Sequence, residues 1–104
     1  MMFAFKPLAR VAVQLGDRLK RPRKATAAEL EQIRRRMGEQ VLDCELKTAR
    51  RVRSQLEGAR TAMQLWLLRS EIYQAVADQF GQPEAQRRVD RLAPLFAGLL
   101  PVRG

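Results

Sequence analysis

The chain contains no histidine and no asparagine, and its 104 residues include a single cysteine. Without histidine, neither a Ser-His-Asp nor a Cys-His catalytic arrangement can form, and a zinc site lacks the ligands it needs. One cysteine cannot form an intramolecular disulfide, and we expect Cys44 to be a small buried apolar residue. No glycine-rich phosphate-binding motif occurs. We therefore expect a protein that is not an enzyme and that carries no metal and no other cofactor.

Long apolar runs are also missing, because no stretch approaches the roughly 18 uninterrupted apolar residues of a membrane span. Residues 1–19 lack the compact apolar region and the cleavage site of a signal peptide. Together these absences predict a cytoplasmic protein. Aromatic residues make up only 6% of the chain and glycine and proline are few, whereas the good helix formers Leu, Ala, Arg, Gln and Glu dominate. The composition therefore predicts an all-α fold.

Charge is abundant and unevenly distributed. The chain has 20 Lys and Arg against 11 Asp and Glu, a net charge of +9. Residues 1–60 hold 15 basic and 7 acidic side chains, net +8, whereas residues 61–104 hold 5 and 4, net +1. A basic excess of this size attracts polyanions without specifying which one.

The chain divides into three parts by pattern. Residues 1–25 predict a basic, amphipathic N-terminal segment followed by a linker, residues 26–100 a helical domain, and residues 101–104 a tail. Thr26 and Glu29 have the spacing of a capping box, in which each side chain accepts a hydrogen bond from the backbone amide of the other. We expect helices near residues 7–19, 27–57, 59–80 and 84–97.

The spacing of apolar residues stays helical from residue 27 to residue 80, with no proline, so the two middle helices could form one long helix. From Ala49 to Phe80 the spacing alternates between three and four over more than four heptads. This heptad stripe predicts a self-associating protein, most simply a homo-oligomer. A monomer would instead need turns at Gly38 and Gly58 and a closed bundle.

The C-terminal part predicts an antiparallel helix hairpin, because Gly81 suits a helix end and Pro83 suits the first turn of the next helix. Pro94 should end or kink that last helix. The expected fold is thus a small helical bundle with one long central helix, either continuous or broken, and a C-terminal hairpin. Its expected core is Trp66, Leu68, Ile72, Tyr73, Val76, Phe80, Val89, Leu92 and Phe96.

The leading functional hypothesis is a non-catalytic helical module whose basic face binds an acidic partner, DNA or RNA above all. On a continuous helix, at about 100° per residue, Arg36, Lys47 and Arg50 would share a narrow arc, with Arg51 beside it. No asparagine and no aromatic within a basic cluster is present to read bases, so we expect phosphate contacts without sequence readout. The candidate anion-binding residues are Arg23, Lys24, Arg34, Arg35, Arg36, Lys47, Arg50, Arg51 and Arg53.

Two other functions fit the same sequence. In the first, the protein is an adaptor or assembly subunit that uses the heptad stripe over residues 49–80, with Leu56, Met63, Trp66 and Tyr73 as interface candidates. In the second, residues 1–24 form an amphipathic anchor on an anionic membrane surface. The basic excess would then serve solubility or lipid attraction rather than nucleic-acid binding.

Overall fold

The computed structural model describes residues 22–101. Within this range the chain forms five α-helices and one 3₁₀ helix and no strand, so the expected all-α class is confirmed. The expected helix at 7–19 lies outside the described residues. The elements are α2 (Ala27–Glu39), α3 (Leu46–Gly58), α4 (Ala62–Leu67), α5 (Arg69–Phe80), α6 (Gln82–Asp90) and the 3₁₀ helix η1 (Ala93–Phe96).

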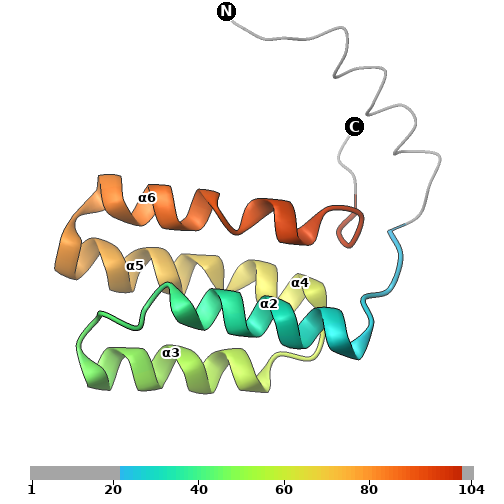
Figure 1. The fold of residues 1–104 in the computed structure, drawn as a ribbon, viewed down its shortest axis with the longest axis horizontal. Coiled ribbons are helices and arrows are strands. Elements are labelled where there is room, and N and C mark those ends of the chain that lie inside the picture. The colour runs from blue at the N-terminus through green and yellow to red at the C-terminus, as the bar shows by residue number, and fades with distance from the viewer. Residues whose placement is uncertain (1–21, 102–104) are drawn as a thin grey trace, which may run out of the picture.

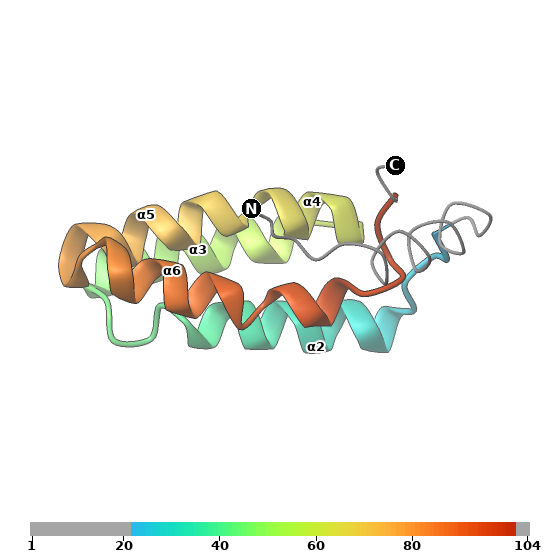
Figure 2. The same ribbon diagram turned by 90° about the horizontal axis from the view of Figure 1, so that it is seen from above.

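With α4 and α5 taken together, consecutive helices run in opposite directions along one axis, and short connections join them (Figure 1). Seen from above, α2 and α6 make one layer, and α3 with α4 and α5 makes the other (Figure 2). The helices α4 and α5 follow one another almost in line, with a single turn residue, Leu68, between them. The small bundle and the C-terminal antiparallel hairpin of α5 and α6 are thereby confirmed.

The expected helix over residues 27–57 is wrong, because residues 40–45 form a loop that turns the chain back on itself. In this loop the amides of Gln40, Val41 and Cys44 each donate to the carbonyl three residues earlier. Such turns keep side chains at a spacing close to that of a helix, so Val41 and Cys44 are still buried. The apolar pattern therefore continues through a break in the helix, and the break follows Glu39 rather than Gly38.

A second break separates α3 from α4 at residues 59–61, directly after Gly58, as expected for a closed bundle. It ends in a capping box: the Thr61 hydroxyl accepts from the amide of Gln64, and Gln64 Oε1 accepts from the amide of Thr61. The predicted capping box of Thr26 and Glu29 at the start of α2 is confirmed. Each box satisfies amides that have no partner within the helix.

The turn between α5 and α6 uses Gly81 at φ +94°, a backbone conformation that glycine adopts without steric cost. Pro83 lies in the first turn of α6, as the sequence predicts. However, α6 ends at Asp90, and the chain continues as η1 around Pro94, so the expected helix over 84–97 is two shorter elements.

The core is a single cluster contributed by every helix. Five of the nine predicted core residues are buried: Ile72, Val76, Val89, Leu92 and Phe96. Trp66, Leu68 and Tyr73 are partly buried and pack against this cluster. Phe80 is 41% exposed, so its assignment to the core is wrong. It is the last residue of α5, and the Arg88 guanidinium covers its ring with Cζ 5.0 Å from the ring centroid.

Candidate nucleic-acid interface

The nine candidate cations fall in three separate places. Arg23 and Lys24 lie in the linker that precedes α2, Arg34, Arg35 and Arg36 lie on α2, and the remaining four lie on α3. Because α2 and α3 are antiparallel, the arc expected on one continuous helix does not exist. Arg36 is separated from Lys47 and Arg50 by the loop, and it does not line the groove between α2 and α3.

The exposed side of α3 is rich in basic residues, and Glu57 is the one acid of this helix. Ala49, Val52 and Leu56 are buried on one side of α3. Lys47, Arg50 and Arg53 are exposed and fall within an arc of about 120° on the other, at about 100° per residue. We call these three residues the α3 cation face. Within residues 22–101, none of them takes part in an ion pair.

Arg51, the fourth cation of α3, forms an ion pair with an acid on another helix. Its Nη1 lies 3.0 Å from Oε1 of Glu71 on α5. Both side chains are substantially exposed, so this pair contributes less than about 1 kcal/mol to stability. Arg51 therefore joins α3 to α5 at the edge of the α3 cation face and has less of its charge available for a partner.

Arg34 has a structural position. Its Nη1 lies 3.3 Å from Oε1 of Glu31, and its Nη2 donates to the carbonyl of Ala59 at 2.8 Å. The carbonyl belongs to the connection between α3 and α4, so Arg34 fastens α2 to that connection. Its Nε is buried and has no hydrogen-bond partner among residues 22–101. The fold therefore uses part of the hydrogen-bonding capacity of the Arg34 guanidinium, which leaves less of it for a partner.

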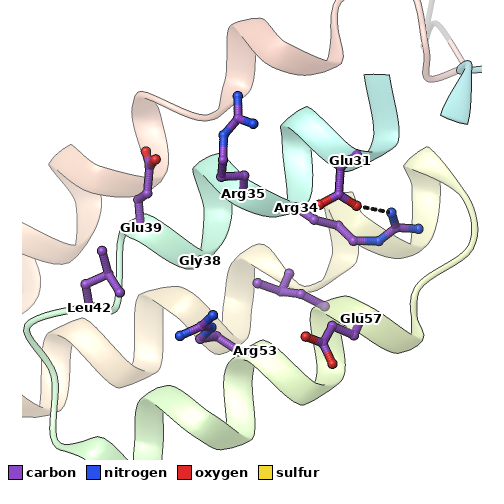
Figure 3. Close-up of a pocket in the computed structure, with 9 residues that line it drawn as sticks. Glu31, Arg34, Arg35, Gly38, Glu39, Leu42, Arg53 and Glu57 are labelled. Carbon is purple, nitrogen blue, oxygen red and sulfur yellow. Dashed lines mark hydrogen bonds and ion pairs between the residues drawn. The ribbon is translucent and has the colours of Figure 1, made fainter. Parts of the chain in front are cut away.

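A groove of about 300 Å³ runs between α2 and α3 (Figure 3), and Gly38 and the buried Leu56 are among the residues that line it. Arg35 and Glu39 border it from α2, and Arg53 and Glu57 border it from α3. The dashed contact in Figure 3 is the pair of Glu31 with Arg34. Three cations and three acids line the groove, so its charge is balanced. The groove itself is therefore a poor phosphate site, and the basic surface begins on its α3 rim.

The linker cations differ from each other. Arg23 donates two hydrogen bonds to Glu29, at 2.8 and 2.6 Å. These bonds, together with the bond from the amide of Thr26, lower the pKa of Glu29 to about 2. Arg23 therefore belongs to the cap of α2. Lys24 is exposed and forms no ion pair with any residue that the structure describes.

Sequence reasoning missed two partly buried arginines, Arg88 and Arg69. Arg88 donates from Nη1 and Nη2 to the Asp43 carboxylate at 2.7 and 2.9 Å, from Nε to Glu84 at 2.6 Å, and from Nη1 to the Gln40 carbonyl at 2.9 Å. Arg69 stacks on Trp66, with Cζ 3.3 Å from the ring centroid, and burial lowers its pKa. The Glu84–Arg88 spacing was a readable signal for a helix pair. Nothing in the sequence pointed to Asp43 as its partner.

The four interface candidates are placed differently from one another. Leu56 is 2% exposed, inside the bundle, and is not on the surface of this fold. Trp66 is partly buried and makes an edge contact with Phe96, with ring centroids 5.0 Å apart. Tyr73 is partly buried, and Met63 is exposed. The N-terminal half of the heptad stripe, including Leu56, is therefore used inside one molecule.

The described helices include none that is long and apolar enough to cross a bilayer. Residues 22–101 bring no three side chains of the metal-binding types together. In comparisons with known proteins, no family model, no curated protein and no solved structure matches this chain.

Proposed function

We propose that the protein is a non-catalytic binding module that holds the phosphate backbone of a nucleic acid on the α3 cation face. The observation that supports this is the exposure of Lys47, Arg50 and Arg53 on one helix face without an ion pair in residues 22–101. Along the helix axis they span about 9 Å, at 1.5 Å per residue. Arg35, on the opposite rim of the groove, is exposed, but Glu39 and Glu57 border the same groove, so Arg35 is not counted in the face.

The chemistry of this face favours contact with phosphates over reading of bases. Guanidinium groups form paired hydrogen bonds with phosphate oxygens. The sequence of α3 has neither asparagine nor an aromatic residue to recognise adenine or stack on bases, and its one glutamine, Gln55, has a buried Oε1. Binding should therefore come from the release of counterions and tolerate any sequence.

Salt dependence gives the size of the expected effect. Three phosphate contacts imply that the logarithm of affinity falls by about 2.7 per decade of salt, at roughly 0.9 per contact on duplex DNA. Residues 22–101 carry 14 basic and 10 acidic side chains, net +4, so the remaining +5 lies outside the described residues and adds to the total slope. The informative quantity is therefore the change in slope between variants.

The test is a salt titration of binding to a fluorescent DNA duplex, followed by anisotropy. Replacing Arg50 and Arg53 by Gln should lower the slope by about 2, at about 1 per lost phosphate contact. A matched variant with Arg36→Gln and Arg91→Gln removes the same net charge from exposed positions away from the α3 cation face. Its slope should stay near that of the unchanged protein. Equal slopes for the two variants, or no binding at low salt, would refute the proposal.

The adaptor and membrane hypotheses have their own measurements. Self-association stays a prediction for those residues of the heptad stripe that the bundle leaves exposed, such as Met63, and sedimentation showing a monomer at micromolar concentration would remove it. The membrane hypothesis concerns residues 1–24, of which 1–21 lie outside the described residues. Co-sedimentation with anionic vesicles that is unaffected by Arg50→Gln and Arg53→Gln, combined with no DNA binding, would favour it over nucleic acid.

A further inference from the structure

A second cavity, of about 190 Å³, lies where the linker before α2 meets the start of α4. Its inner wall is apolar, because Ala62 and Leu99 are buried and Leu30 is partly buried. The amide of Arg23 donates to the carbonyl of Gly98 at 3.1 Å, which fixes the linker against the C-terminal segment. This hydrogen bond joins two of the segments that line the cavity, the linker and the C-terminal segment.

The rim of this cavity is positively charged. Lys24 and Arg60 are both exposed and border the opening, and neither forms an ion pair within the described part of the chain. Arg23 also lines it, with its charge directed to Glu29. No acidic side chain among the described residues lines the cavity, in contrast to the groove between α2 and α3. An occupant with negative charge beside its apolar group would match both features.

We propose that this cavity is a docking site for an acidic peptide of a partner protein, which inserts one large apolar side chain between flanking carboxylates. The volume suits one side chain: a cavity of about 150 Å³ holds benzene, and ligand pockets usually begin at about 300 Å³. Met63 on the cavity wall and Leu67, one helical turn further along α4, are exposed. They extend the apolar surface beside the opening, where a peptide would continue.

The chain's own N-terminal residues are a poorer match to the same cavity. Residues 1–21 hold apolar side chains, but they also hold five basic residues and one acid. Placing them beside Lys24 and Arg60 would bring like charges together, whereas an acidic peptide would bring opposite charges together. The docking site is lined by no residue of α3 and does not depend on the proposed nucleic-acid binding.

The probe is a labelled peptide of sequence Asp-Glu-Phe-Glu-Asp with blocked ends, titrated into the full chain and followed by anisotropy and by amide NMR shifts. We expect saturable binding, with shifts concentrated at Ala25, Met63 and Leu99. Replacing the peptide's Phe by Ala should weaken binding about tenfold or more, because burial of the ring is lost. Replacing its acids by Gln should weaken binding and remove its salt dependence.

Variants of the protein separate the pocket from general electrostatic attraction. Ala25→Leu adds bulk at the cavity wall and should reduce affinity about tenfold without altering net charge. Lys24→Gln with Arg60→Gln should also weaken binding, whereas the charge-matched Arg36→Gln with Arg91→Gln should not. Peptide shifts centred on α3, equal affinity for the Phe and Ala peptides, no binding at millimolar peptide, or contacts between residues 1–21 and Ala62 in the free protein would each overturn the proposal.

Discussion

Arg88 is the side chain whose removal should reveal most about how the bundle closes. It lies on α6 with 14% of its side chain exposed, and it reaches the loop between α2 and α3, 45 residues earlier in the chain. It binds Asp43 and the Gln40 carbonyl there, Glu84 on its own helix, and the face of Phe80 on α5. One guanidinium group thus contacts three parts of the chain: the loop between α2 and α3, the end of α5, and α6 itself. The perturbation we choose is Arg88→Met, which keeps the aliphatic length and removes every hydrogen bond.

The magnitude follows from the exposure of each partner. Asp43 is half exposed, so water replaces much of what the arginine provides and this pair contributes less than about 1 kcal/mol. Glu84 is largely enclosed, and hydrogen bonds between charged groups in such places contribute about 1.5–3 kcal/mol. Arg87, which also pairs with Glu84, compensates in part. We therefore expect Arg88→Met to lower the free energy of unfolding by about 2–3 kcal/mol.

Urea denaturation at neutral pH measures this loss directly. The free energy of unfolding of Arg88→Lys should lie between that of Arg88→Met and that of the unchanged protein. An ammonium group cannot reproduce the planar fork that binds both oxygens of Asp43. Arg51→Met, which breaks an exposed pair, is the control and should cost less than about 1 kcal/mol. If Arg88→Met and Arg51→Met cost the same, the interpretation of Arg88 as an enclosed link is refuted.

The remaining predictions concern packing, backbone and pH. Leu65 is fully buried, whereas Leu67 is 64% exposed. In thermal denaturation, Leu65→Ala should therefore lower the free energy of unfolding by about 2–5 kcal/mol, and Leu67→Ala should change it by less than about 0.5 kcal/mol. Gly81→Ala should lower the free energy of unfolding by about 1–3 kcal/mol, because φ at this position is +94°. Gly58→Ala should raise it by up to about 1 kcal/mol, because a Cβ at this position of α3 meets open space. An NMR titration should give Glu29 a pKa of about 2, below its ordinary 4.5, so its contribution to stability is present above pH 4.5 and lost as the pH falls through about 2. Glu29→Gln should remove that part of the acid dependence.

Local signals in the sequence predicted the ends of helices well where a side chain or glycine determines the backbone. Thr26 with Glu29 and the Gly81 turn were readable because the residues that form the cap or turn are adjacent in the chain. Thr61 with Gln64 has the same pattern and was equally readable, but the heptad spacing across it favoured a continuous helix. Local chemistry was the better guide there.

The loop at 40–45 could not be predicted from apolar spacing, because Val41 and Cys44 remain buried at helical intervals through its turns. The arrangement of the basic residues then failed for the same reason: reversing the chain puts Arg36 and Lys47 on two antiparallel helices instead of on one face of a single helix. Pairings such as Arg34 with the Ala59 carbonyl and Arg88 with Asp43 depend on which helices become neighbours. Periodicity within one segment carries no information about that choice.

The alternation of direction along the chain has a consequence for how the protein reaches its fold. Most helix packing joins elements that are neighbours in sequence, as with α2 and α3 or α5 and α6. Contacts between sequence neighbours close only short loops, so they cost little chain entropy. Helical domains of this topology therefore fold on the order of microseconds to milliseconds. The long-range links, from Arg88 to Asp43 and from the amide of Arg23 to Gly98, would then form last. The cavity beside the linker, which depends on the second of these links, would be among the final features to take shape.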